Sequence, residues 1–136
     1  MKDTSVTLKF DGKISLYSVI KKINIDVKWI FTDLMALGKF EDINKIMSLQ
    51  TKKTDELNFF DTEKILDLTK DLDFIWGVFL AFPKDSNPVF SELPHSENRT
   101  EIQHELEIVE VRAFDGDFIS IISQDEKILG KFKQNE

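Results

Sequence analysis

Residues 105–133 (ELEIVEVRAFDGDFISIISQDEKILGKFK) constrain the fold more than any other stretch, because they have the pattern of three consecutive β-strands joined by two short turns. Asp115-Gly116 is a dipeptide favoured in two-residue hairpin turns, whose central residues take positive φ angles. It is predicted to join a strand over Leu106–Phe114 to a strand over Asp117–Ser123. A second turn over Gln124–Glu126 leads to a last strand over Ile128–Phe132. The chain is therefore predicted to end in an antiparallel β-meander.

Upstream of this meander, helices are predicted from apolar side chains that recur at helical spacing. Three segments have this pattern: residues 14–24, the stretch between Gly38 and Gln50, and residues 59–72. Asp61 or Thr62 is suited to begin the third helix, because its side-chain oxygen can accept a hydrogen bond from an otherwise unpaired amide.

Strands are predicted where apolar and polar residues alternate, or where a short run is β-branched and aromatic. Residues 4–10 alternate, and residues 27–34 (VKWIFTDL) are expected to form a second strand that pairs near the first. Residues 74–82 (FIWGVFLAF) are almost continuously apolar, which favours a central strand covered on both faces. Gly77 within this run is expected to mark a bulge or a close approach by a helix.

Early helices and a late meander together predict a single α+β domain over residues 1–136. We expect a mainly antiparallel sheet of about five to six strands, with two to three helices packed on one face and a C-terminal β-meander. The long segment Lys84–His104 has the composition of a loop, and loops of that length are usually functional or loosely ordered.

Composition and charge narrow the setting and the partners. The chain has 136 residues, no cysteine and a net charge of −7. A cysteine-free chain without an apolar run of signal-peptide or membrane-spanning length is expected in the cytoplasm, with no membrane association. Net negative charge disfavours binding to nucleic acids and to anionic membrane surfaces.

Two candidate carboxyl clusters have simpler structural explanations. His104 lies near Glu101 and Glu105, but a zinc site would need a further convergent ligand, so a surface role is expected for this histidine. Asp115 and Asp117 flank the turn glycine, and the turn accounts for both without the paired-carboxyl chemistry of a glycosidase.

Other signatures of catalysis are missing from the sequence. The five glycines are scattered singly, so no phosphate-binding loop is formed, and no serine lies in a nucleophile elbow. Trp29 and Trp76 lie in apolar runs and are expected in the core rather than around a ligand. The sequence therefore predicts a protein that is not an enzyme and has neither a cofactor nor a metal.

The acidic residues are unevenly distributed. Residues 85–126 hold eleven acidic and two basic residues, a net charge of −9, whereas the rest of the chain has a net charge of +2. Concentrated negative charge destabilises a fold by self-repulsion, but it speeds association with a basic partner and biases its orientation. An ordinary solvated surface is the simpler alternative.

The candidate partner-binding residues are Glu101, Glu105, Glu107, Glu110, Asp115 and Asp117. An odd separation along a regular strand is expected to put Glu107 and Glu110 on opposite faces. The loop Lys84–His104 is an alternative contact surface, which would order on binding.

The order of strand, helix and aromatic strand, followed by WGVFLAFP and ELEIVEVRAFDGDFISIISQDEKI, resembles small immunity proteins of bacterial contact-dependent growth inhibition and related polymorphic toxin systems. The resemblance covers most of the chain and lies in size, acidity, composition and strand order. It implies a cytoplasmic protein that binds the C-terminal domain of a cognate toxin, often a basic nuclease, and blocks it without catalysis. Two other classes stay open: a small-ligand-binding or enzymatic domain with a pocket near Trp29, Trp76 and His104, and a housekeeping regulatory subunit.

Overall fold

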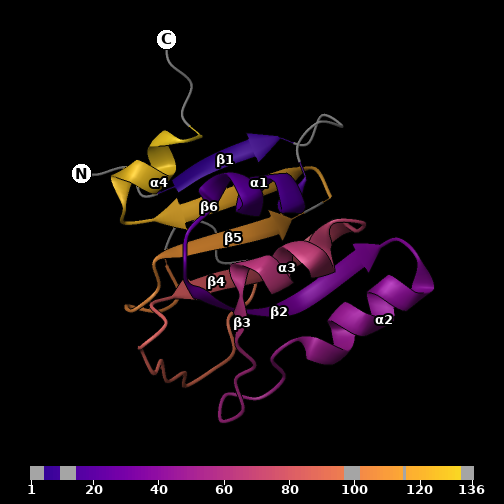
Figure 1. Ribbon diagram of the computed structural model, residues 1–136, viewed down its shortest axis with the longest axis horizontal. Coiled ribbons are helices and arrows are strands. Elements are labelled where there is room, and N and C mark those ends of the chain that lie inside the picture. The colour runs from indigo at the N-terminus through magenta and orange to yellow at the C-terminus, as the bar shows by residue number, and fades with distance from the viewer. Residues whose placement is uncertain (1–4, 10–14, 97–101, 115, 133–136) are drawn as a thin grey trace.

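The computed structural model describes residues 5–9, 15–96, 102–114 and 116–132, which form one α+β domain with a six-stranded antiparallel sheet and four helices (Figure 1). In chain order the elements are β1 (Ser5–Lys9), α1 (Leu16–Ile23), β2 (Lys28–Leu37), α2 (Phe40–Leu49), β3 (Phe60–Asp61), α3 (Thr62–Thr69), β4 (Asp73–Phe82), β5 (Val109–Phe114), β6 (Phe118–Ser123) and α4 (Glu126–Gly130). The predicted fold class is confirmed.

The sheet has the order β1-β6-β5-β4-β2-β3, and every neighbouring pair is antiparallel. Two of the three strands of the predicted C-terminal meander are present as β5 and β6, and the third strand beside them is β4, which precedes them in the chain. Helices α1 and α3 lie side by side across one face of the sheet, as Figure 1 shows. Helices α2 and α4 add buried residues to the same core, so this side of the sheet is the helix-covered face.

The helix-covered face is apolar, and its helices α1 and α3 begin at polar caps. Ser15 accepts a hydrogen bond from the amide of Ser18 at the start of α1, and Asp61 accepts one from the amide of Lys64 at the start of α3, as predicted. Trp29 is fully buried between the sheet and α3, and its indole N–H donates to Thr62 Oγ1 at 2.9 Å. The core prediction for Trp29 is confirmed.

The opposite, helix-free face carries a second apolar cluster, which contains Ile30, Val78, Leu80 and Phe82. Phe90 packs on this cluster from the connection between β4 and β5. We call this connection, residues 83–108, the covering segment. Its described part, residues 83–96 and 102–108, contains neither a helix nor a strand. On this face the covering segment, rather than a helix, packs over the apolar cluster.

The predicted last strand, Ile128–Phe132, is wrong, because this stretch begins with the helix α4. Asp125 caps α4 by accepting a hydrogen bond from the amide of Lys127. Ile128 and Leu129 are both buried in the helix-side core, which two consecutive residues of a strand cannot achieve on one face. The position beside β6 that a last strand would have taken is occupied by β1.

The predicted pairing of the first two strands is also wrong. Strand β1 pairs with β6, whereas β2 pairs with β4 and β3, so β6, β5 and β4 separate the two. Ser5 opposes Ile122 across the β1–β6 pair, a contact between the two ends of the chain. The local sequence pattern gives no information about such long-range pairing between strands.

Gly77 marks an irregularity of the sheet, as predicted, but the close neighbour comes from a strand rather than a helix. The β2–β4 register shifts between Thr32 and Met35, where Asp33 has a φ angle of 55°. A Cβ atom at Gly77 would lie 2.6 Å from Leu34 Cδ2. The bulge therefore presses Leu34 against the backbone of β4, where only a glycine leaves room.

The β5–β6 turn is one residue longer than predicted. Phe114 opposes Phe118, which leaves three residues in the loop instead of two. Gly116 has a φ angle of 70°, as its role in the turn requires, and Asp115 lies outside the described residues.

Gly77→Ala is predicted to lower the free energy of unfolding by about 1–3 kcal/mol, because the added methyl group overpacks against Leu34. Gly130→Ala is the matched control, since a Cβ there meets no atom within 4 Å and alanine favours the helical conformation of α4. Urea denaturation of both variants measures the difference. Equal stability of the two variants would contradict the tight contact at Gly77.

Candidate functional site

The covering segment is held on the helix-free face by an aromatic contact at the end of β4. The ring of His104 packs against Phe82 and Phe90, with ring centroids 5.4 and 4.6 Å away. His104 Nδ1 accepts a hydrogen bond from the amide of Leu106 at 3.1 Å, so Nε2 is the protonated nitrogen and donates to the carbonyl oxygen of Val89 at 3.0 Å. His104 therefore joins two distant parts of the covering segment as a neutral imidazole.

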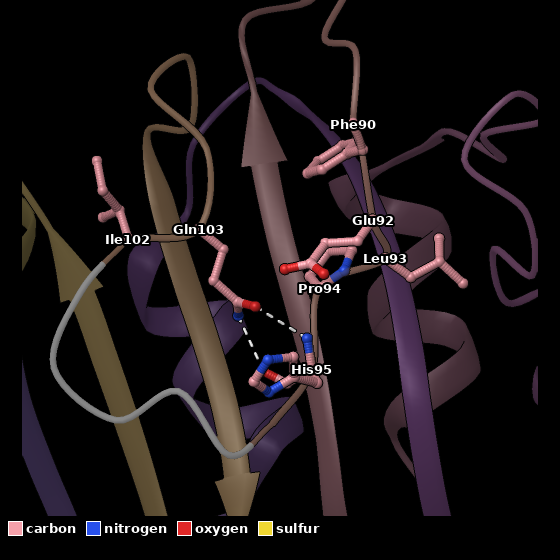
Figure 2. Close-up of a pocket in the computed structure, with 7 residues that line it drawn as sticks. All are labelled: Phe90, Glu92, Leu93, Pro94, His95, Ile102 and Gln103. Atoms are coloured by element: carbon pink, nitrogen blue, oxygen red, sulfur yellow. Dashed lines mark hydrogen bonds between the residues drawn. The ribbon is translucent and has the colours of Figure 1, made fainter.

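Next to this contact, Gln103 links the covering segment to the sheet. Its side-chain amide donates to the carbonyl oxygen of His95 and accepts from the His95 amide, both at 2.9 Å, as Figure 2 shows. The same Nε2 donates to Glu110 Oε2 on β5 at 2.7 Å. One glutamine thus satisfies the backbone of His95 and reaches a buried carboxylate below.

Glu110 and Arg112 form a buried ion pair on β5. They are two residues apart on one strand, so their side chains lie on the same face, and their exposed fractions are 0% and 1%. Arg112 Nε donates to Glu110 Oε2, the oxygen that also accepts from Gln103. Burial of two charges is tolerated only with such close pairing and further hydrogen bonds.

Glu107 adds a second carboxyl group to this buried pair. Its Oε1 accepts from the amides of Gln103 and His104, both at 2.8 Å. The pKa of Glu107 is raised to about 9, chiefly by burial and then by the charge of Glu110 and a side-chain hydrogen bond with Glu110, whereas the two amide donors act in the opposite direction. Glu107 is therefore protonated at neutral pH.

A proton shared between Glu107 and Glu110 accounts for two buried carboxyl oxygens that have no other donor in the described part of the chain. Glu107 Oε2 and Glu110 Oε1 receive no hydrogen bond from an N–H or hydroxyl donor among the described residues. A proton held by Glu107 and donated to Glu110 satisfies both. We call Gln103, Glu107, Glu110 and Arg112 the carboxyl cluster; it contains one carboxylate and one guanidinium and is neutral overall.

A further contact fastens the covering segment to β2. The amide and the hydroxyl of Ser96 both donate to Asp33 Oδ2, at 2.9 and 2.8 Å. Asp33 takes its left-handed conformation in the bulge of β2, which directs this carboxylate toward the covering segment. The segment is thus attached to β2 through Asp33 and to β5 through Glu110.

The hollows of the described surface include a cleft and a groove. A cleft of about 210 Å³ lies beside the Gln103–His95 contact (Figure 2) and is lined by Phe90, Glu92, Leu93, Pro94, His95, Ile102 and Gln103. A groove of about 560 Å³ at the start of α3 is lined by Asn24, Ile25, Asp26, Asp61, Thr62, Glu63, Leu66 and Lys84. In this groove Lys84 donates to Asp26 at 2.5 Å, which raises the pKa of Lys84. The groove has the volume of a small-molecule site, whereas the cleft is below that range.

The predicted partner-binding residues fall into three groups. Glu105 and Asp117 are exposed, as a contact with a partner requires. Glu107 and Glu110 are buried in the carboxyl cluster, so they are not part of the acidic surface. Glu101 and Asp115 lie outside the described residues.

The expectation that Glu107 and Glu110 lie on opposite faces is wrong as well. Strand β5 begins at Val109, so Glu107 belongs to the turn before the strand, and the alternation of side chains does not apply to it. This turn brings both carboxyl groups to the same place on the helix-free face.

Exposed acidic residues of the stretch 85–126 lie at both ends of the β5–β6 pair. Phe114 opposes Phe118 at one end of the β5–β6 pair, beside Asp117, and Val109 opposes Ser123 at the other end. The second end carries the exposed residues Glu105, Asp125 and Glu126. A span of five residues separates the ends of β5 by about 17 Å, so the acidic stretch does not fold into one compact patch.

Trp29, Trp76 and His104 do not share a pocket. Trp29 lies in the helix-side core, and His104 packs on the helix-free face. Trp76 is six residues from Phe82 along β4, a distance of about 20 Å, and it is 39% exposed. The prediction that Trp76 belongs to the core is therefore wrong.

Arg112 and Gln103 are the site residues that sequence reasoning missed. A signal for Arg112 exists, because it is the only basic residue in the strand VEVRAF and follows Glu110 by two residues, the spacing of a same-face pair. Gln103 has no comparable signal, since its role depends on the path of the covering segment.

Among the described residues there is no group of three or more histidine or acidic side chains placed to hold a metal ion. Within the same part of the chain, no helix has the length and apolar character needed to cross a membrane. Comparison of the chain with protein-family models, with curated proteins and with solved structures gives no match. The resemblance to immunity proteins stays a prediction.

The carboxyl cluster predicts an unusual dependence of stability on pH. Glu107 has a pKa of about 9 in the folded protein and an ordinary value of 4.5 otherwise, so between these values the folded state holds a proton that the unfolded state has lost. The contribution of Glu107 to the free energy of unfolding therefore falls as pH rises through this window, by up to about 1.4 kcal/mol per pH unit.

Glu107→Gln is predicted to remove this slope and to stabilise the protein at pH 8. The amide oxygen accepts from Gln103 and His104 as before, and the amide nitrogen donates to Glu110 at every pH. Denaturation from pH 5 to pH 9 measures the effect, with the exposed neighbour change Glu105→Gln as control. A Glu107→Gln variant that is less stable at pH 8 and keeps the wild-type slope would refute the protonated state of Glu107.

Proposed function

We propose that this protein is a cytoplasmic immunity protein, which binds the C-terminal domain of a cognate toxin and neutralises it stoichiometrically, without catalysis. One observation carries the proposal. Within residues 85–126, the described lysine and arginine residues include none that is exposed, since Arg112 is buried. The exposed carboxylates of this stretch are those of Asp85, Glu92, Glu105, Asp117, Asp125 and Glu126.

The carboxyl cluster decides which charges of this stretch reach the surface. It takes Glu107 and Glu110 into the interior, and it also removes the one described arginine of the stretch from the surface by pairing it with Glu110. Exposed carboxylates are thus the charged groups that the described part of this stretch presents to a partner. An acidic surface of this kind imitates the phosphate charge that a basic nuclease attracts and speeds encounter with it.

The dimensions of the protein are suitable for an inhibitor. The accessible surface is 8100 Å², and a standard interface buries about 800 Å² on each partner, roughly a tenth of this surface. The covering segment is attached to β2 and β5 before any partner arrives. Contacts that are already ordered reduce the entropy lost on binding.

A small-ligand-binding domain is the second candidate, and the groove at the start of α3 favours it. Asp26, Asp61 and Glu63 line this groove against a single lysine, Lys84, so a cationic ligand is the chemistry it would accept. A regulatory subunit would use the same acidic surface as an immunity protein. Gene order separates these classes, since an immunity gene is expected directly downstream of a large toxin gene.

Co-expression tests the proposed function directly. The C-terminal domain encoded immediately upstream is expected to arrest growth when expressed alone and to be harmless when this protein is produced with it. The purified pair is expected to form a one-to-one complex in calorimetry. Toxicity that persists in the presence of the protein, together with no complex, would refute the proposal.

Charge reversal is predicted to slow association with the toxin domain, and it identifies which end of the sheet meets the partner. Glu105→Lys and Asp117→Lys place the same charge change at opposite ends of β5, and Asp55→Lys is the matched control in the exposed loop after α2. At low salt the reversal at the contacting end is expected to lower the association rate about tenfold and to weaken its salt dependence. Stopped-flow kinetics measure the association rate of each variant. Equal rates for all three variants at low salt would contradict an acidic interface.

A further inference from the structure

Most of the exposed large apolar side chains come from one corner of the molecule, where β2 ends, α2 begins and β4 begins. Among the described residues six such side chains are exposed, and four come from the end of β2, the start of α2 and the start of β4. We call these four the apolar corner: Met35 (44% exposed), Leu37 (56%), Phe40 (77%) and Trp76 (39%). The other two, Val89 and Leu106, belong to the covering segment.

The sheet places three of these side chains, Met35, Leu37 and Trp76, near one another. Met35 opposes Trp76 across the β2–β4 pair, and Leu37 follows Met35 by two residues on the same strand. Trp76 precedes Val78 by two residues, so it shares the helix-free face with Val78. Phe40 is the first residue of α2, three positions after Leu37.

The described part of the covering segment leaves the apolar corner exposed. Its contacts with the helix-free face include those at Phe82, Glu110 and Asp33. Trp76 is about 20 Å from Phe82 along β4. The corner keeps its exposure although a tryptophan and two aliphatic side chains occupy it.

Acidic residues surround the apolar corner. Asp73 opposes Leu37 across the β2–β4 pair, and Asp33 precedes Met35 by two residues. Asp117 is nearby, because the amide of Gly116 donates to the carbonyl oxygen of Ile75 at 2.9 Å. All three aspartates are exposed, and Lys39 is the one basic residue in residues 33–40 and 71–76.

We propose that the apolar corner is the centre of the interface with the basic toxin domain, an inference that rests on the proposed function and assigns its contact surface. A desolvated tryptophan surrounded by charged residues is the arrangement in which a few side chains supply most of the binding energy. The partner that fits has exposed apolar side chains flanked by lysine or arginine residues, which pair with Asp33, Asp73 and Asp117. The end of the sheet with Asp117 is then the contacting end.

A second copy of this chain fits the corner less well. A symmetric dimer through the apolar corner would bring the same aspartates of two chains together, and the whole chain has a net charge of −7. Like charges opposed across an interface disfavour the complex. Charge complementarity therefore selects a basic partner.

The test measures binding of the toxin domain encoded directly upstream, in a catalytically inactive form, to immobilised variants of this protein. Trp76→Ala is expected to raise the dissociation rate at least about 30-fold, because it removes the central anchor. Leu37→Ser provides a second variant at the last residue of β2, where loss of the side chain leaves the core unchanged, and a smaller increase is expected. Val89→Ser is the control, because Val89 is 81% exposed and lies on the covering segment. Near-UV circular dichroism verifies that each variant is folded.

The outcomes separate this inference from the proposed function. If the wild-type protein binds and all three variants dissociate at the wild-type rate, the apolar corner is not the interface, although the proposed function stands. If the wild-type protein does not bind the toxin domain, both the inference about the apolar corner and the proposed function are refuted. If sedimentation shows a wild-type dimer that Trp76→Ala converts to a monomer, the corner binds a second copy instead, and the inference is overturned.

Discussion

The buried ion pair between Glu110 and Arg112 is the interaction on which the architecture of the helix-free face depends. Two opposite charges in the middle of a sheet are stable only if water is excluded and the remaining hydrogen-bonding groups are satisfied. Gln103 and the protonated Glu107 provide such partners for Glu110, and both belong to the covering segment. The ion pair therefore requires the segment to lie over β5, and the segment in turn has its backbone amides fixed by Glu107.

The two faces of the sheet are consequently built on different physical principles. The helix-covered face is an apolar core, in which the stripes of α1 and α3 pack on side chains such as Phe31 and Phe79. The helix-free face is divided between a half under the covering segment, where an apolar cluster lies beside the carboxyl cluster, and an exposed half at the apolar corner. The covering segment holds the strands β2 and β5 in place at one half of this face. The exposed half belongs to the same sheet, so its side chains lie on a rigid surface.

Local sequence pattern determined most of the elements. The stripe of α1, the cap of α3 at Asp61 and the apolar run of β4 each arise from interactions within a few residues, and the structure confirms them. The pattern was misleading at Ile128–Phe132, where alternation and helical spacing are hard to distinguish over five residues. It was also misleading at Trp76, because an aromatic residue in an apolar run is buried only if another element covers it.

The sequence by itself determined the fold class, the hairpin of β5 and β6, and the excess of acidic residues between 85 and 126. Only the tertiary structure decided which of those carboxyl groups face solvent. Glu105 and Glu107 are two residues apart and chemically identical, yet one is exposed and the other is protonated in the interior. The difference depends on where Gln103, Arg112 and the covering segment lie in space, and burial and charge pairing of this kind arise from long-range contacts that no local pattern specifies.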